Sequence, residues 1–470
     1  MESPGDSRAS PDHVRIRNPG AEVATPAVGS DRPQRVLVIW PPQVPSYFNA
    51  GHRLAVFQVS AYLRHHRGAD VVAVDAAALN VNWKECGDLL FQGEFDVIAL
   101  ANDFDAIDGF DRFIHYAREL CPQARLVTFG RLSGMHPAVF ERFDLDGIVA
   151  SGDYESGVAA FLDLVTAGPS LLGPGQGLAV RDGARWIHDT RKGARLDPDD
   201  WCLPDVTEIP YHAYDALYAN DAHRFCGIPN RRELVVPVAR GCPVGCSFCE
   251  VPDLFGKRER RLPVHRVVDY IEHAFAVEPF EYVAFYAPTF TLDPAWVRAL
   301  CSALRTSSSQ PRWKCATTVH HLTEELVHDM GAAGCVRISV GLETLAETGH
   351  GSLPRIKRLE TKQFTDLVQW CDAAGVELNA FVIVGLPGTA IEAARHTIEL
   401  VEQLGVRVRP TMYTPYHEMS AELSNLELSS YNRHLIHPGA DVSARALHYR
   451  EIFGANDRLT AVFERVPSRT

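Results

Sequence analysis

Three cysteines stand close together in the middle of the sequence, at Cys242, Cys246 and Cys249. Their spacing is C-x3-C-x2-C, in a loop of Gly, Pro and Ser that directly follows the apolar run at residues 234–239. Thiolates bind soft metals and iron–sulfur clusters, and three of them can hold three irons of a [4Fe-4S] cluster while the fourth iron keeps an open position. The spacing therefore predicts a [4Fe-4S] cluster with one iron available for chemistry.

Two other interpretations of this loop stay open. A structural zinc site usually has four ligands, and no Cys or His occurs at residues 250–261, directly after the third cysteine. Packed, unliganded thiols are more usual on an apolar face than among Gly, Pro and Ser. The spacing favours the cluster.

With Phe248 just before its last cysteine, the loop resembles the cluster motif of the radical S-adenosylmethionine enzymes. The resemblance implies that the amino and carboxylate groups of S-adenosylmethionine bind the open iron, with Phe248 in the binding site. It further implies that an electron from the cluster cleaves this cofactor to a 5′-deoxyadenosyl radical. An external reductant of the flavodoxin or ferredoxin type would supply the electron.

Composition sets limits on the class of protein. The chain of 470 residues is 46% hydrophobic, which predicts a globular enzyme of two or three domains, and its formal net charge of −13 argues against nucleic-acid binding. Eleven cysteines, an odd number, do not suggest a secreted disulfide framework. The N-terminus is polar and no long apolar run occurs, so we expect no signal peptide, no membrane segment and a cytoplasmic location.

Apolar patterning divides this α/β chain into five parts. Residues 1–33 read as a disordered tail, and residues 34–165 as a doubly wound parallel sheet with helices on both faces. Residues 166–232 read as a connector, residues 233–420 as a partial (β/α)6 barrel of the TIM type, and residues 421–470 as a cap over the open side of the barrel. The expected strands are residues 36–40, 71–74, 97–100, 126–129 and 147–150 in the sheet, and residues 233–240, 282–286, 313–317, 336–340, 378–384 and 406–413 in the barrel.

The first domain, followed by the cysteine loop, is similar to the cobalamin-binding domain of one branch of the radical S-adenosylmethionine family, the class B methyltransferase-like enzymes. The likeness lies in the turn at residues 40–42, the turn at 129–133 and the segment 151–155. The chain lacks the D-x-H-x-x-G signature that gives cobalt a histidine in other cobalamin domains, so a domain of this fold without a cofactor stays an alternative. The implied cobalamin-binding residues are Trp40, Pro41, Asn102, Gly130, Arg131, Ser133, Gly152 and Asp153.

The barrel strands also end in residues that resemble the family's S-adenosylmethionine site. Glu343 follows the fourth strand, and Ile383 and Gly385 belong to the motif at the end of the fifth. A surface carboxylate and an ordinary β-to-α turn are the respective alternatives. After the second strand the sequence departs from the family's acidic or polar residue, which predicts that Tyr286, Thr289 or Thr291 takes its place through a hydroxyl.

Catalytic residues are not fixed by the sequence. Tyr286, His320 and His417 are candidates because each follows a barrel strand and can exchange a proton. Lining a pocket or capping a helix is the alternative role for such residues.

These observations predict a cobalamin-dependent radical S-adenosylmethionine enzyme, in the first place a C-methyltransferase acting on a small molecule or natural-product intermediate. The resemblance implies that cobalamin carries the methyl group from one S-adenosylmethionine, and that a second one generates the radical. A methyl transfer without an adenosyl radical, as in the tryptophan methylases of thiopeptide biosynthesis, would fit the departure after the second strand. The alternatives are a radical enzyme that cyclises, rearranges or oxidises its substrate, and a noncatalytic iron–sulfur or zinc protein.

Overall fold

The computed structural model describes residues 32–42, 53–104, 106–167, 172–218, 232–429 and 431. The described residues from Gln34 onward belong to one compact unit. The tail expected at residues 1–33 and most of the expected cap lie outside the described residues.

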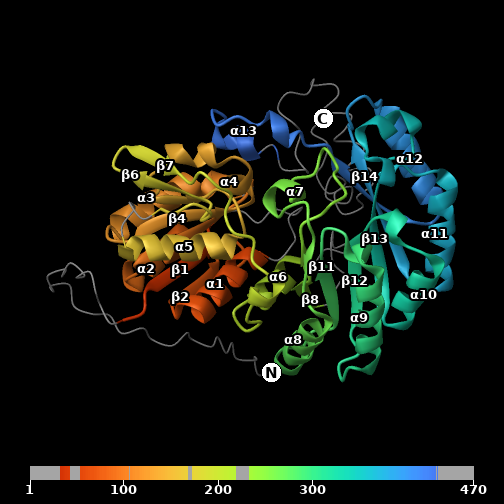
Figure 1. Ribbon diagram of the computed structural model, residues 1–470, viewed down its shortest axis with the longest axis horizontal. Helices are drawn as coiled ribbons and strands as arrows, with labels where there is room; N and C mark the ends of the chain where they lie inside the picture. The colour runs from red at the N-terminus through yellow and green to blue at the C-terminus, as the bar shows by residue number, and fades with distance from the viewer. Residues whose placement is uncertain are drawn as a thin grey trace, which may run out of the picture. The chain divides into compact units, whose positions relative to one another are not determined.

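The first half of the chain forms a seven-stranded sheet, shown in red to yellow in Figure 1. Five of its strands are parallel in the order β2-β1-β3-β4-β5, which is a doubly wound order with a switch point between β1 and β3. The two further strands, β6 and β7, are antiparallel and extend the sheet beyond β5. Side by side, the strands are β2 (Asp70–Asp75), β1 (Arg35–Trp40), β3 (Val97–Asn102), β4 (Arg125–Gly130), β5 (Gly147–Val149), β6 (Leu178–Asp182) and β7 (Arg185–His188).

Helices cover both faces of this sheet because its central strands are apolar on both sides; all six residues of β3 are buried. On one face lie α1 (Leu54–Arg67) and α5 (Tyr154–Ala167), which contact each other. On the other lie α2 (Trp83–Gly93) and α3 (Phe110–Leu120). The short helix α4 (Arg131–Met135) begins directly after β4.

The second half forms an open, fully parallel sheet of six strands in sequential order, with β8 and β15 at its edges (Figure 1). The expected partial barrel is thus found, with its strands within a few residues of the expected bounds. The strands are β8 (Glu233–Pro237), β11 (Tyr282–Tyr286), β12 (Arg312–Thr317), β13 (Cys335–Glu343), β14 (Glu377–Val384) and β15 (Arg407–Met412). The helices between them are α8 (Val264–Val277), α9 (Pro294–Thr306), α10 (Glu324–Ala332), α11 (Thr361–Ala373) and α12 (Ile391–Gln403).

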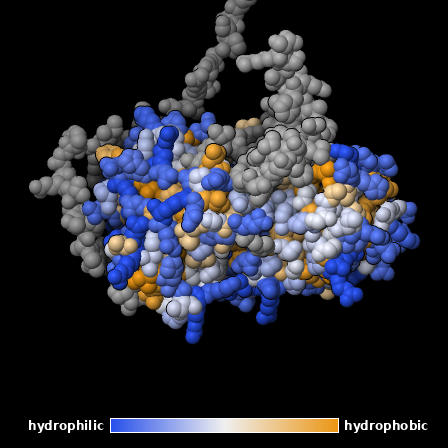
Figure 2. All heavy atoms as spheres, turned by 90° about the horizontal axis from the view of Figure 1, so that it is seen from above, coloured by the Kyte–Doolittle hydropathy of each residue, from blue (hydrophilic) through white to orange (hydrophobic). Residues whose placement is uncertain are grey.

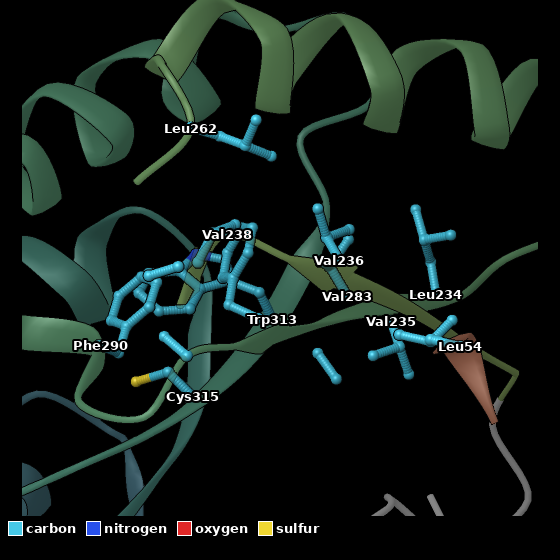
Figure 3. Packing of buried hydrophobic residues seen from close by; sticks show 14 of the residues in the cluster. Leu54, Leu234, Val235, Val236, Val238, Leu262, Val283, Phe290, Trp313 and Cys315 are labelled. Atoms are coloured by element: carbon cyan, nitrogen blue, oxygen red, sulfur yellow. The ribbon is translucent and has the colours of Figure 1, made fainter. Parts of the chain in front are cut away.

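Aromatic side chains fill the layer between this sheet and its helices. Trp313 on β12 is fully buried, with its ring 5.7 Å from that of Phe290 and 5.4 Å from that of Phe285. Figure 3 shows Trp313 and Phe290 packed together, with Val283 of β11 in the same cluster. Because side chains alternate along a strand, the residues between these apolar positions point to the opposite, inner face of the sheet.

The segment expected as a connector carries more structure than its composition suggested. Its first part forms the hairpin β6–β7, and its later part contains α6 (Tyr211–Tyr218). It is attached to both halves: the Tyr214 hydroxyl donates to Asp75 at the end of β2 over 2.6 Å, and Arg266 of α8 donates to the carbonyl of Trp201 over 2.6 Å.

The described part of the expected cap packs on the first domain. Helix α13 (Asn425–Ser429) packs against the 3-10 helix Ile107–Gly109 (Figure 1). The Asn425 amide donates to Asp111 of α3 over 3.0 Å, and Leu428 joins the apolar core beneath α3.

The surface is mixed in character. Hydrophilic residues cover much of the face seen in Figure 2, with smaller apolar areas between them. Within the described ranges, no helix is long and apolar enough to cross a membrane.

Candidate functional site

The three cysteines lie on a loop between two short strands that close it at its base. Strand β9 (Ala239–Arg240) precedes the loop and pairs with β10 (Arg260–Arg261), and α7 (Val251–Leu254) follows it. Gly241 has φ 86°, and a side chain there would overlap the carbonyl oxygen of Arg258. The Cys242 amide donates to the Gly256 carbonyl over 3.0 Å, so the loop closes tightly upon itself.

The donor set of this loop fits an iron–sulfur cluster. Cys242 is buried, and Cys246 and Cys249 are half-buried. The described residues contain no group of three or more His, Cys, Asp or Glu side chains gathered around a single metal ion. A cluster does not need such a group, because its cysteine ligands bind different irons.

Glu343 and Lys357 form a buried ion pair next to the cysteines. Glu343 is at the end of β13 with φ 65°, and its Oε1 lies 2.5 Å from Lys357 Nζ on the 3-10 helix Arg355–Lys357. Burial opposes the charge of Lys357, but Glu343 and the Cys246 and Cys249 thiols raise the pKa of the ammonium above its usual value. The carboxylate expected to contact S-adenosylmethionine is therefore already held by a cation.

The other residues expected at this site lie on neighbouring strands. Ile383 and Phe381 belong to the inner face of β14, because Ala380, Val382 and Val384 join the core on the helix side. Gly385 follows with φ 83°. Phe248 lies within the cysteine loop itself.

At the end of β11 the structure separates the three hydroxyl groups expected there. The Thr289 hydroxyl is buried 3.6 Å from Cys242 Sγ. The Thr291 hydroxyl is engaged with that of Thr317, 2.6 Å away. Tyr286 is 64% exposed and lies close enough to Arg131 to act on the pKa of its guanidinium.

The histidine expected after β12 lies near Lys357, because the 3-10 helix Val319–His321 contacts the 3-10 helix Arg355–Lys357. His320 and His321 form the 3-10 helix after β12, and burial lowers the pKa of both imidazoles, which favours their neutral form. The side chain of His417 lies outside the described residues.

At the edge of the first domain, several side chains implied for cobalamin are engaged within the protein. The Asn102 amide donates to Thr128 Oγ1 over 2.8 Å and accepts from the Ser133 backbone, while the Ser133 hydroxyl donates to the Val149 carbonyl. Gly130 has φ 149°, and a Cβ there would overlap the carbonyl oxygen of Asn102.

Trp40 and Pro41, at the end of β1, are both buried. The Trp40 indole N–H has no hydrogen-bond partner among the described residues. The Arg53 guanidinium stacks 4.0 Å from the Trp40 ring.

Arg131 connects this edge to the cysteine loop. Its guanidinium lies 3.1 Å from Glu250, the residue after Cys249, and 3.4 Å from Asp103 at the end of β3. It also donates to the Tyr416 hydroxyl and stacks over the rings of Phe104 and Tyr416. Burial opposes its charge, but the Glu250 carboxylate and its neighbours hold the pKa of Arg131 well above its usual value.

A second ionic network joins the two domains on the other side of the loop. Asp153 has no exposed surface and lies 3.1 Å from Arg240 and 2.7 Å from Arg260. Arg240 also lies 2.5 Å from Glu155 of α5, and its guanidinium stacks 4.5 Å over the Trp201 ring. Gly152 has φ 90° and abuts the backbone of Gly193.

Glu250 and Lys357 were not among the residues predicted from the sequence. Glu250 follows Cys249 directly, so its position beside the cluster loop was readable from the sequence. Lys357 is 108 residues from Cys249 and carried no comparable signal.

Comparisons with known proteins agree with this geometry. Residues 236–401 match the model of the Radical SAM superfamily. A protein of Pyrococcus horikoshii named as an uncharacterized methyltransferase is 23% identical over 355 residues, covering 74% of this chain and 73% of that protein. The anaerobic magnesium-protoporphyrin IX monomethyl ester cyclase of Rubrivivax gelatinosus is 23% identical over 421 residues, covering 85% of this chain and 72% of the cyclase.

Solved structures show the same fold. The methyltransferase TsrM from Kitasatospora setae, with cobalamin and a [4Fe-4S] cluster bound, has a TM-score of 0.64 at 17% identity, covering 81% of this chain and 75% of TsrM. The cobalamin-dependent radical enzyme OxsB with aqua-cobalamin bound has a TM-score of 0.59 at 16% identity, covering 92% of this chain and 56% of OxsB. These findings confirm the resemblance stated from the sequence. The chain contains a radical S-adenosylmethionine domain, and its fold is that of cobalamin-dependent radical S-adenosylmethionine enzymes.

Proposed function

We propose that this protein is a cobalamin-dependent radical S-adenosylmethionine enzyme that methylates a carbon atom of a small molecule or natural-product intermediate. One observation carries the proposal: the carboxyl edge of the first sheet is joined to the cysteine loop by the ion pair of Arg131 and Glu250, 3.1 Å apart. Ligands of doubly wound sheets bind at that edge, so a corrinoid there would lie beside the cluster. Methyl transfer from cobalamin to a substrate radical would require the corrinoid and the cluster to lie close together.

The residues that would hold the cluster and S-adenosylmethionine come from the barrel. Cys242, Cys246 and Cys249 would bind three irons, and Thr289 lies beside the first of these thiols. When bound, the two groups together supply reductive cleavage of the sulfonium. Phe248, Glu343, Ile383 and Gly385 would contact S-adenosylmethionine.

The chain's own residues would orient the cofactors and keep water out. Lys357 holds the Glu343 carboxylate in one place, so that its second oxygen can accept from a hydroxyl of the bound cofactor. Tyr286 is well placed to meet the substrate because it is exposed and lies near Arg131. Tyr286 and His320 remain our candidates for moving a substrate proton, with His417 as a third.

At the carboxyl edge of the first sheet, the contacts of the expected residues favour a different mode of cobalamin binding. Asn102, Ser133 and Asp153 would have to break existing hydrogen bonds or ion pairs to contact a ligand. We therefore propose that Trp40, Pro41, Gly130 and Gly152 contact cobalamin, largely through backbone and ring surfaces, while Asn102, Arg131, Ser133 and Asp153 shape the edge from beneath.

A second candidate function is oxidation or cyclisation without methyl transfer. The relative named as a cyclase aligns with 85% of this chain, a larger share than the relative named as a methyltransferase. The discriminating observation is the product: a methylated product supports the first function, and a cyclised or oxidised one the second. We further propose an external reductant of the flavodoxin or ferredoxin type and a cytoplasmic location.

Anaerobic reconstitution with iron, sulfide and hydroxocobalamin tests the proposal. Iron, sulfide and corrinoid are counted in the wild type, in a triple variant with Cys242, Cys246 and Cys249 changed to Ala, and in Cys202→Ala as a control. We expect four irons in the wild type and the control, no cluster in the triple variant, and one corrinoid in all three. A cluster without corrinoid would refute the methyltransferase, and zinc without sulfide would refute the radical enzyme altogether.

A further inference from the structure

The cysteine loop is attached to the first domain at both of its ends. Arg240, two residues before Cys242, pairs with Asp153 and Glu155 at 3.1 and 2.5 Å. Glu250, directly after Cys249, pairs with Arg131 at 3.1 Å. The loop is thus fixed between two charged contacts whose partners follow the carboxyl ends of β4 and β5.

The contact at Glu250 is a chain of alternating charges. Arg131 stands between Glu250 and Asp103, and the side chains of all three retain at most 20% exposure. The rings of Phe104 and Tyr416 pack on the guanidinium, with their centres 4.9 and 5.2 Å away. Charges in such a poorly hydrated place interact more strongly than at the surface.

The backbone around this contact is closely packed as well. Helix α4, which begins with Arg131, contacts α7, which follows the loop. A Cβ on Gly134 of α4 would lie 2.7 Å from Leu254 Cδ2 of α7. A change in the position of Arg131 is therefore transmitted to the end of the loop that carries Cys249.

We infer that Arg131 is a positioning residue that couples the cobalamin edge to the cluster, by compensating the carboxylate of Glu250 next to Cys249. The inference rests on the proposed function. The reduction potential of an iron–sulfur cluster depends on nearby charge and hydrogen bonding. Without Arg131, the negative charge of Glu250 would disfavour addition of an electron to the cluster. A corrinoid at the edge, beside Asp103, would change whether Arg131 pairs mainly with Asp103 or with Glu250. The reduction potential of the cluster would then shift.

The first test needs no corrinoid and no activity. The midpoint potential of the reconstituted cluster is measured by redox titration followed by electron paramagnetic resonance, in the wild type, R131Q, E250Q and R131Q/E250Q. We expect a lower potential in R131Q, a higher one in E250Q and a return towards the wild type in the double variant. R118Q is the matched control, because Arg118 pairs with Asp144 and Asp146 at the opposite, amino edge of the same sheet. An unchanged potential in R131Q would overturn the inference. If R131Q fails to fold, the potential is measured in R131K and E250Q. R131K keeps the charge and should keep the potential of the wild type, and an unchanged potential in E250Q would then overturn the inference.

The second test adds hydroxocobalamin and counts bound corrinoid independently of the potential. We expect the potential of the wild type to shift on corrinoid binding, and that of R131Q to shift less. Corrinoid binding without a shift in the wild type would refute the coupling while leaving the proposed function intact. Failure to bind corrinoid would refute the proposed function and the coupling with it, and the first test alone would then decide whether Arg131 compensates Glu250.

Discussion

Lys357 Nζ lies 2.5 Å from Glu343 Oε1, and both side chains are buried at the end of β13. Changing Lys357 to Met would leave a buried carboxylate without its cation. We expect this to lower the free energy of unfolding by about 3–5 kcal/mol. Urea unfolding of the cluster-free protein measures the change.

Two further variants make this prediction specific. The double variant Glu343→Gln/Lys357→Met replaces the pair by neutral groups and should recover more than half of the loss. Lys362→Met removes an ion pair with Asp366 whose lysine side chain is 79% exposed, and should cost about 0.5 kcal/mol or less. Equal losses in Lys357→Met and Lys362→Met would show that the buried pair has no special importance.

The network around Arg240 should make the two domains unfold together. Changing Arg240 to Met leaves Asp153 with Arg260 and leaves Glu155 buried without its cation. We expect a loss of about 3–5 kcal/mol and, in thermal denaturation followed by circular dichroism, two separate transitions where the wild type shows one. Arg67→Met is the control, because its ion pair with Asp163 is at the outside of α5. A single, unshifted transition in Arg240→Met would contradict the prediction.

Gly130 should not tolerate a side chain, even in the absence of any cofactor. An alanine Cβ would overlap the Asn102 carbonyl oxygen, and φ 149° disfavours any L-residue. We expect Gly130→Ala to cost roughly 2–5 kcal/mol of stability. Gly183 lies in the β6–β7 turn with φ 59° and open space where a Cβ would stand. Gly183→Ala should therefore lower the free energy of unfolding by only about 1 kcal/mol. Similar losses at both positions in urea unfolding would mean that backbone conformation, and not the contact with Asn102, decides.

Thiol labelling should distinguish the cysteine loop from the packed cysteines. Burial raises the pKa of Cys86, Cys301 and Cys371 to about 12, so at pH 8 only roughly one in ten thousand of these thiols is ionised. Burial raises the pKa of Cys246 as well, but Cys246 and Cys249 are only half-buried, so iodoacetamide should reach these two thiols of the cluster-free protein before the packed ones.

Peptide mass spectrometry measures the order of modification, and urea provides the control in which every cysteine reacts. Reconstitution of the cluster should then protect Cys246 and Cys249. Continued labelling of these two residues in protein that has taken up four irons would place the cluster elsewhere.

Much of the fold was readable because its strands are short apolar runs between helices of regular period. The strand at residues 282–286 was predicted with the bounds that the structure gives to β11, and five parallel strands of the first sheet were found where the pattern placed them. The β6–β7 hairpin was missed although its sequence signal was present. Gly183 stands between two short apolar runs, but the surrounding Asp and Pro residues favoured a connector.

The site was less predictable because charged contacts join residues far apart in the sequence. Arg131 and Asp153 were expected from strand order to lie at the ligand-binding edge of the first sheet. In the structure, Arg131 pairs with Glu250, and Asp153 pairs with Arg240 and Arg260. A sequence shows which strand ends meet at an edge, but it does not show which side chains there turn towards the protein and which towards a ligand.

The position of α13 has a consequence for how this chain is made. Tyr416, Met419, Leu428 and Tyr431 complete an apolar core that otherwise consists of residues from the first domain, including Phe110 and Phe140. On the ribosome, the first sheet is complete at His188, about 230 residues before the segment that covers it, which at typical synthesis rates is on the order of 10–45 s. During that time the surface beneath α13 is open to chaperones and to other nascent chains. This apolar core is therefore completed only after residues 416–431 have been made.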